Sequence, residues 1–177
     1  GKRVPSDNWV FSKFVCAKLS LNNNAFLNLR LFGVFGKHED YSIRFISNSI
    51  CRTIFDIPIL INQNIVFDYL FVDDFIKILD RFIEGKVKHN IYNLTPTEST
   101  DLVSIVRKIE KISNKKINYK IRKKGYGNEY TGSNKLLLSE LKHFEFTDLS
   151  DSIAQLYKWY LSRKSILNVG EIKKDYF

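Results

Sequence analysis

A short apolar run at residues 25–32 restricts the fold more than any other feature of the sequence. It follows residues 8–21, whose broad apolar face predicts a helix that is buried on most of its sides. The run itself is apolar at successive positions, which is typical of a central strand in a parallel sheet, and residues 33–36 supply a turn in which glycine is tolerated. A strand directly after a helix predicts an α/β fold.

The rest of the chain continues to alternate between helical and strand-like patterns. Apolar residues at helical spacing predict helices at 43–55, 75–83, 102–112 and about 151–161. Short apolar or alternating runs predict strands at 59–61, 65–71, 89–94 and 117–121. Residues 62–64 join the first two of these strands, either as a hairpin or as a link between separate strands. The polar segment beyond Lys164 is expected to be frayed or bound elsewhere.

Polar residues mark where several of the predicted helices begin. Ser6 or Asp7 can cap the first helix, and Ser99 or Thr100 can cap the helix at 102–112. The Asp73-Asp74 pair precedes another helix, so we interpret it as a cap and not as a pair of metal ligands. The three histidines have no partner pattern typical of metal or triad chemistry.

The composition excludes several classes of protein. With 177 residues and 44% apolar content, the chain can bury a real core as one domain or as a piece of a larger one. It contains no Met, so we expect a fragment or a processed product. No apolar run is long enough to span a bilayer, and no signal-peptide pattern opens the chain. Cys16 and Cys51 lie in apolar helical patterns, which predicts buried, reduced thiols in a cytoplasmic protein.

The formal net charge of +9 admits a nucleic acid or another anion as a partner. Because the lysines are spread through the chain, we expect the charge to serve mainly solubility. The exception is a concentration of basic residues within 115–124, at Lys115, Lys116, Lys120, Arg122, Lys123 and Lys124. Nucleic-acid binding through this segment is therefore a third, less favoured hypothesis, and it predicts an affinity that falls steeply with salt.

Four motifs, in order, resemble a known family. They are Trp9-Val10-Phe11-Ser12-Lys13, residues 29–36 (LRLFGVFG), residues 67–74 (FDYLFVDD) and Ile91-Tyr92-Asn93-Leu94. Together they are similar to the second half of the extended short-chain dehydrogenase/reductases, the NAD-dependent nucleotide-sugar epimerases, dehydratases and reductases. The resemblance covers roughly residues 3 to 163.

The resemblance implies the C-terminal part of a modified Rossmann fold. Residues 1–37 would supply a late helix and strand of the Rossmann core, and 38–164 would form mostly a small α/β substrate-binding domain with returning sheet strands, followed by a tail at 165–177. No G-x-G-x-x-G sequence occurs in the chain, so the Gly-rich half that would bind the dinucleotide pyrophosphate is absent. The cofactor implied is NAD or NADP, bound only together with that half.

Lys13 matches the family's Lys, which contacts the nicotinamide ribose and lowers the pKa of a Tyr four residues earlier. Here that earlier position is Trp9, and an indole N–H cannot serve as a general acid or base near neutral pH. Ser12 matches a Ser that often precedes the Lys. On a helix, Trp9 and Lys13 share one face, and a Lys on so apolar a face needs an anionic or hydroxyl partner.

Other family positions have also changed. Phe32 matches a residue packed near the nicotinamide ring, whereas Gly33 stands where many members carry a substrate-binding Asn. Phe67 stands where many members carry Arg, which removes a phosphate ligand. Both Phe32 and Phe67 also suit a core position.

Basic residues elsewhere could bind the substrate's diphosphate instead. Arg44 precedes a predicted helix and is either a phosphate clamp or one half of a surface ion pair. Arg122 and Lys123 precede Gly125, where Lys123 matches a family Arg that clamps the diphosphate. A Lys supplies charge without the bidentate fork of an Arg.

The resemblance leaves two leading hypotheses for function. In the first, the chain is the C-terminal part of an NAD(P)-dependent nucleotide-sugar epimerase, dehydratase or reductase that serves surface-polysaccharide synthesis. The apolar surface of the helix carrying Lys13 would then be either a homodimer interface or a face buried against the missing N-terminal half. In the second, the changes at Trp9, Gly33 and Phe67 mark a non-catalytic relative that binds a nucleotide-sugar or a partner subunit.

Overall fold

The computed structural model describes residues 6–21, 23, 25–85 and 87–174, in which helices and strands alternate. The helices are α1 (Asn8–Ser20), α2 (Phe45–Ile54), α3 (Val72–Glu84), α4 (Leu102–Ser113), α5 (Lys135–Glu140), α6 (Leu149–Leu161), a 3-10 turn (Lys164–Ile166) and α7 (Val169–Lys173). The strands are β1 (Asn28–Leu31), β2 (Gly33–Phe35), β3 (Ile59–Asn64), β4 (Val66–Phe67), β5 (Tyr69–Phe71), β6 (Ile91–Leu94), β7 (Thr100–Asp101) and β8 (Tyr119–Tyr126). The predicted α/β class is confirmed.

Each described strand pairs with a strand that is distant in the sequence. β1 pairs with β6, β2 with β5 and β3 with β8, all in parallel, whereas β4 and β7 are antiparallel. Parallel pairing needs a crossover, and helices supply it in this fold. The strands at 59–61 and 65–71 are therefore separate strands and not a hairpin, and residues 62–64 continue β3.

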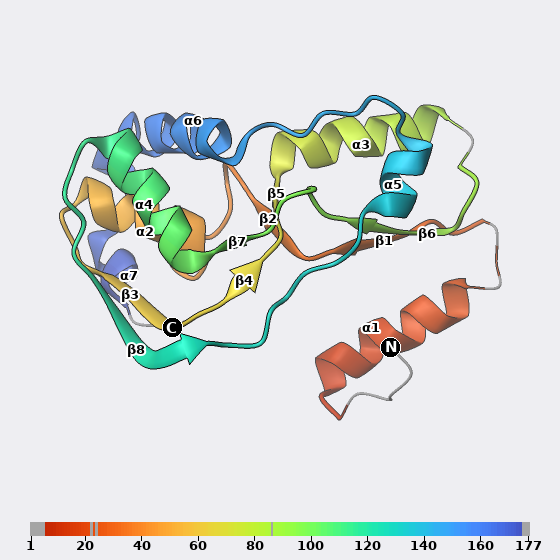
Figure 1. Cartoon of the computed structure of the whole chain (residues 1–177), viewed down its shortest axis with the longest axis horizontal. Coiled ribbons are helices and arrows are strands. Elements are labelled where there is room, and N and C mark those ends of the chain that lie inside the picture. The colour runs from red at the N-terminus through yellow and green to blue at the C-terminus, as the bar shows by residue number, and fades with distance from the viewer. Residues whose placement is uncertain (1–5, 22, 24, 86, 175–177) are drawn as a thin grey trace.

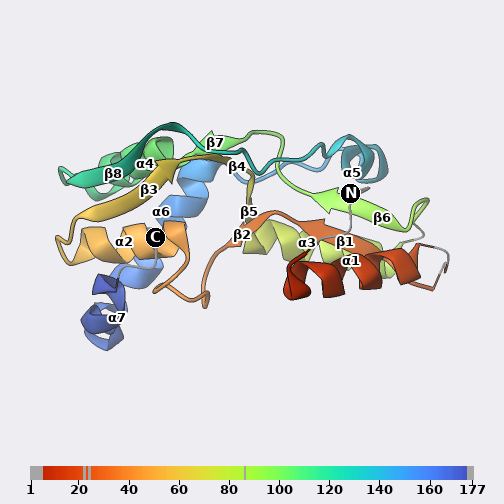
Figure 2. The same ribbon diagram turned by 90° about the horizontal axis from the view of Figure 1, so that it is seen from below.

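The chain forms two lobes, which are joined near β2 and β5 (Figure 1). One lobe holds α2, α4, α6, α7, β3 and β8 around a core that includes Ile50, Ile105 and Leu156. The other lobe holds α3, α5, β1 and β6 around a smaller core that includes Ile78 and Tyr92. Figure 1 shows α3 and α1 on opposite sides of β1 and β6, and in Figure 2, seen from below, α1 lies in front of α3.

Two positions require glycine, one where β2 approaches α3 and one at the irregularity in β8. Gly36 follows β2, where an added Cβ would lie 2.2 Å from Val72 Cγ1, so glycine permits the close approach of β2 to the start of α3. Gly125 has φ +76° and lies where the β3–β8 register shifts, a backbone conformation that favours glycine. The predicted turn at 33–36 is wrong in part, because Gly33, Val34 and Phe35 form β2.

The helix predicted at residues 8–21 forms, but its predicted burial is wrong. Asp7 accepts a hydrogen bond from the Val10 N–H, as expected of a cap. No residue of α1 is buried, and the exposed fractions of Trp9 and Leu19 are 67% and 74%. An apolar pattern indicates that a helix has a face suited to contacts. It does not show that the described residues of this chain cover that face.

Several smaller predictions are also corrected. Asp101, and not Ser99 or Thr100, caps α4, because its carboxylate accepts from the Ser104 N–H. Cys16 is exposed, whereas Cys51 is buried as predicted, and both are free thiols.

The segment after Lys164 is not frayed over the part that the structure describes, since α7 buries Ile172 completely. The buried Arg52 side chain of α2 donates from Nη2 to the Lys174 carbonyl oxygen, which fixes the end of this segment. Residues 175–177 of the predicted tail lie outside the described residues. No helix in the described part of the chain is long and apolar enough to cross a membrane.

Candidate functional site

The exposed face of α1 carries the first pair of predicted site residues. The Lys13 ammonium nitrogen lies 4.0 Å from the centroid of the Trp9 ring, so the two side chains are neighbours as the helical spacing predicted. The Ser12 hydroxyl donates to the Trp9 carbonyl oxygen at 2.8 Å. Lys13 is exposed, which corrects the expectation of a partly buried ammonium. Its partner is the indole face, and a cation over an aromatic ring is an attractive contact.

Phe32 and Gly33 lie at the junction of β1 and β2 beside a cluster of aromatic rings. The centroids of Phe32 and Phe67 are 5.3 Å and 5.8 Å from that of Tyr130, and Phe67 is also 5.5 Å from Tyr69. These separations are typical of favourable aromatic contacts. Phe32 and Phe67 are both half-buried, so each packs within this cluster and still reaches the surface.

Gly33 leaves room for the Tyr69 ring where many members of the resembling family carry Asn. A Cβ at position 33 would lie 3.0 Å from the Asp68 carbonyl oxygen and 3.2 Å from Tyr69 Cδ1. The Gly33 N–H also donates to that Asp68 oxygen at 3.0 Å. A larger side chain could be admitted only by moving the ring or the backbone, so the expected polar contact is replaced here by an aromatic surface.

Asp68 connects the segments that surround the aromatic cluster. Its carboxylate is 1% exposed and accepts hydrogen bonds from the Ser99 hydroxyl at 2.5 Å and from the Gly132 N–H at 2.7 Å. Gly132 in turn lies under the Phe32 ring, since an added Cβ would be 2.3 Å from Phe32 Cζ. A buried carboxylate is tolerated only with such partners. Asp68 therefore fixes two loops that are far apart in the sequence.

Tyr130, Gly132 and Asp68 belong to this site, although none of them was predicted to be a site residue. Asp68 did carry a signal, because a carboxylate inside the apolar run 65–71 must find hydrogen-bond donors. Tyr130 and Gly132 carried none, since they lie in a segment between β8 and α5 without regular patterning.

The remaining predicted residues lie in the other lobe. Arg44 precedes α2, is exposed, and donates its backbone N–H to the Asp40 carbonyl oxygen. Arg122 and Lys123 lie on β8, every residue of which is exposed, and Lys123 is in register with Gln63 of β3. Figure 1 shows α1 in the right-hand half of the molecule, whereas α2 and β8 lie in the left-hand half. Lys13 and Trp9 are thus together, as are Arg122 and Lys123, whereas α1 is separate from the basic residues.

A half-buried carboxyl group, that of Glu39, lies on the link between β2 and α2. Burial raises its pKa from the usual 4.5 to about 7, although a hydrogen bond from the Ser47 hydroxyl, another from the Gly36 N–H and the charge of Arg44 each lower it. Its charge also contributes to the raised pKa of the Tyr69 hydroxyl, for which burial is the larger cause. Near neutral pH this carboxyl group is therefore partly protonated.

Asp74 has a different role from the predicted one. It is 1% exposed and accepts from the Thr147 N–H at 2.7 Å and the Thr147 hydroxyl at 2.8 Å, with the Lys77 ammonium 3.1 Å away. Neither it nor Asp73 caps α3, whose first turn has no side-chain cap. Within the described residues, no group of three or more His, Cys, Asp or Glu side chains could hold a metal ion.

A nicotinamide dinucleotide fits only part of this residue set. Lys13 is exposed and can donate to ribose hydroxyls, and the half-buried Phe32 is partly accessible. The 177 residues contain no Gly-rich phosphate-binding motif, so the pyrophosphate would have to be held elsewhere.

The fold itself resembles a group of solved enzymes. No protein-family description and no curated protein sequence matches the chain. Among the solved structures, UDP-glucuronic acid 4-epimerase from Bacillus cereus, in complex with UDP-glucuronic acid and NAD, is 21% identical with a TM-score of 0.71, over 88% of this chain and 51% of that one. dTDP-glucose 4,6-dehydratase from Bacillus anthracis, in complex with NAD, is 17% identical with a TM-score of 0.75, over 91% and 54%.

A third similar structure is neither an epimerase nor a dehydratase by name. GDP-L-fucose synthetase from Naegleria fowleri is 13% identical with a TM-score of 0.67, over 88% of this chain and 52% of that one. The chain therefore spans about half the length of each of these three structures. At such identities the likeness establishes the fold, and the chain has the fold of the C-terminal part of the extended short-chain dehydrogenase/reductases, the nucleotide-sugar epimerases and dehydratases.

Proposed function

We propose that this chain is the substrate-binding half of an NAD(P)-dependent nucleotide-sugar epimerase, dehydratase or reductase. The observation that carries the proposal is the structural likeness to three such enzymes over 88–91% of the chain. When bound, the cofactor would supply hydride exchange with the sugar. Lys13 would hold the nicotinamide ribose, and Phe32 would lie beside the ring.

In this proposal cationic side chains bind the diphosphate, because two positions that carry polar ligands in many family members do not do so here. Gly33 and Phe67 supply no polar side chain, so Arg44, Arg122 and Lys123 are the cations assigned to the substrate. The aromatic cluster of Phe32, Phe67 and Tyr130 provides an apolar surface on which a base or a sugar face can lie.

Titration of the chain with UDP-glucose, dTDP-glucose and GDP-mannose tests the substrate class. We expect Lys123→Ala to weaken binding about tenfold, because a charge-assisted hydrogen bond to phosphate is lost. Lys111→Ala is the matched control, since it removes the same charge from an exposed position on α4 and should leave the affinity unchanged. Equal affinities for the wild type and the Lys123 variant would contradict this assignment.

A second candidate function is binding without turnover, and Trp9 favours it specifically. The indole at the position of the family Tyr cannot exchange a proton with a sugar hydroxyl, and it instead contacts the Lys13 ammonium. The test is Trp9→Tyr in the chain joined to a Gly-rich cofactor-binding half. A rise in turnover supports position 9 as the acid/base site, whereas an unchanged rate and unchanged sugar binding support the non-catalytic candidate.

Further parts of the proposal concern location and partners. A role in surface-polysaccharide synthesis in the cytoplasm fits the proposed substrate class, and two free thiols suit a reducing compartment. The exposed apolar residues of α1, Trp9, Val10, Phe11 and Leu19, suit a homodimer interface. Nucleic-acid binding by residues 115–124 stays the less favoured alternative, and it would require retention of DNA or RNA at low salt.

A further inference from the structure

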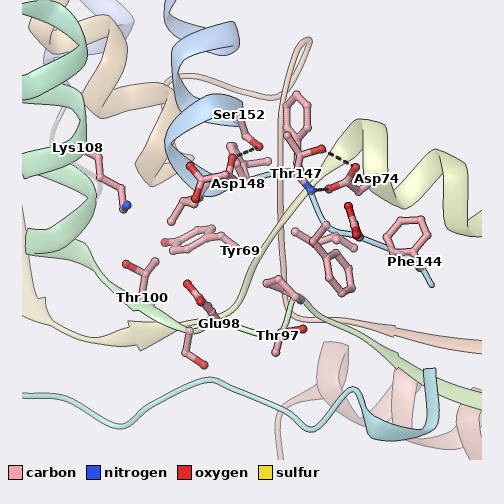
Figure 3. A pocket seen from close by; sticks show the side chains of 18 residues that line it. Tyr69, Asp74, Thr97, Glu98, Thr100, Lys108, Phe144, Thr147, Asp148 and Ser152 are labelled. Atoms are coloured by element: carbon pink, nitrogen blue, oxygen red, sulfur yellow. Dashed lines mark hydrogen bonds between the residues drawn. The ribbon is translucent and has the colours of Figure 1, made fainter. Parts of the chain in front are cut away.

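A cavity of about 430 Å³ lies between the two lobes. Its walls come from β5, the segment 96–100, α4, the segment 144–149 and the start of α6 (Figure 3). None of Trp9, Lys13, Phe32, Gly33, Arg44, Arg122 and Lys123 lines it. A volume of this order is typical of pockets that hold small ligands.

The wall formed by residues 144–149 is held in a fixed position. The buried Asp74 carboxylate accepts both hydrogen bonds from Thr147, and these bonds appear in Figure 3. Asp148 caps α6 through the N–H groups of Ser150 and Asp151, and the Ser152 hydroxyl donates to the Asp148 carbonyl oxygen at 2.9 Å. The cavity is therefore lined by residues whose backbone is already tied to α3 and α6, and binding would order little of it.

An aromatic ring with polar groups of both kinds around it occupies one side of the cavity. Figure 3 shows Tyr69 with Glu98, Thr100, Lys108 and Asp148 arranged about its ring. The carboxylates of Glu98 and Asp148 accept hydrogen bonds, the Lys108 ammonium donates, and the Thr100 hydroxyl does both. Lys108 is held in place by its contact with the Ser150 hydroxyl at 3.0 Å.

This mixture of groups selects among classes of ligand. A metal cation would need converging oxygen atoms, and an anion would need donors only, whereas sugar hydroxyls donate and accept at once. An anion is further disfavoured because carboxylates, at Asp74, Glu98, Glu145 and Asp148, outnumber Lys108 among the described residues that line the cavity. The flat face of Tyr69 suits the C–H face of a sugar ring.

We propose that this cavity binds an uncharged sugar of one or two rings at a site separate from the nucleotide-sugar surface. Glu98 accepts from its hydroxyl groups, Lys108 donates to them, and the Tyr69 ring lies along one face of the sugar. The other side of Tyr69 packs over Gly33, so this ring separates the cavity from the aromatic cluster. The inference does not rest on the proposed function, because it uses none of the residues assigned there.

The test is a titration of the full 177-residue chain with D-glucose and maltose at millimolar concentrations, followed by the backbone amide signals in NMR. We expect shifts at residues 69–71, 96–100 and 144–149. D-glucuronate, which has a carboxylate, should bind at least about tenfold more weakly because of the acidic lining. Shifts confined to α1 or β8, or no shifts with either neutral sugar, would overturn the proposal.

A pair of variants makes the test specific to the cavity. Glu98 is exposed and has no hydrogen-bond or ion-pair partner within the described residues, so Glu98→Ala should fold normally and weaken sugar binding about tenfold. Glu84→Ala, at the exposed end of α3, makes the same change of charge outside the cavity and should not alter it. Equal affinities for both variants would contradict the site, as would saturable binding of methylamine with the same shifts, which would indicate a cation site instead.

Discussion

The half-buried carboxyl group of Glu39 makes a contribution to stability that depends on pH. Its pKa is raised by burial from 4.5 to about 7, so between these values the folded state binds a proton that the unfolded state has released. The contribution of Glu39 to stability is therefore greatest below about pH 4.5 and is lost as the pH rises to about 7. The fall amounts to up to about 3 kcal/mol.

Glu39→Gln removes this titration and keeps the acceptor for the Ser47 hydroxyl. The variant should match the wild type at low pH and exceed its free energy of unfolding by up to about 3 kcal/mol above neutral pH. Urea unfolding at a series of pH values measures the difference. A difference that is the same at every pH would mean that folding does not shift the pKa of Glu39.

The two cysteines should differ sharply in reactivity. Cys16 is exposed on α1, whereas Cys51 is completely buried and burial raises the pKa of its thiol to about 12. We expect a thiol reagent to modify Cys16 rapidly in the native protein and Cys51 only after unfolding. Mass spectrometry of the labelled peptides assigns the sites, and equal labelling of both would contradict the burial of Cys51.

The environment of a side chain was hardest to predict where several neighbouring residues could play the same role or where its partner is distant in the sequence. Cys51 lies in the middle of an apolar helical pattern, and its burial was predicted correctly, whereas the same kind of pattern gave the wrong burial for Cys16 because the described chain does not cover α1. Ser99, Thr100 and Asp101 are all suitable caps, and only the backbone geometry at the start of α4 selects Asp101. Asp74 was interpreted from its neighbours in sequence, while its partner Thr147 lies 73 residues away.

At the scale of elements, α7 gives the clearest stability prediction. Ile172 is completely buried in the larger core, whereas Ile166 in the preceding 3-10 turn is 75% exposed. Ile172→Ala should lower the free energy of unfolding by about 3 kcal/mol, and Ile166→Ala, its control, by less than about 0.5 kcal/mol. Chemical denaturation of both variants provides the measurement, and similar losses would mean that α7 does not pack as described.

Helices could be placed from the sequence better than strand partners could. Apolar spacing located α2, α3, α4 and α6, because side chains that recur every three or four residues define a face. The same spacing could not tell that the face of α1 stays uncovered. Strand patterns show which residues face the core but carry no record of the partner, so the pairing of β3 with β8 was not predictable. The six-residue α5 is too short to show a period.

At the scale of the whole molecule, the two cores should differ in local stability. The core around Ile78 and Tyr92 has seven buried residues among those described, against seventeen in the core around Ile50 and Ile105. Because burial of apolar surface dominates local stability, the smaller core should open more readily. Native-state hydrogen exchange should therefore show faster exchange at Ile78 in α3 than at Ile109 in α4. Identical protection would mean that both lobes unfold as one unit.

The pairing of strands that are distant in sequence also determines when the fold can form during synthesis. Asn28 of β1 is in register with Ile91, and Ile59 of β3 is in register with Tyr119. Neither pair of strands can therefore form as a local hairpin. Long-range pairings slow folding because loop closure costs entropy before the contact stabilises the chain. On the ribosome, β1 therefore stays unpaired until Ile91 has emerged, and β3 stays unpaired until Tyr119 has emerged, so both leave strand edges exposed during synthesis.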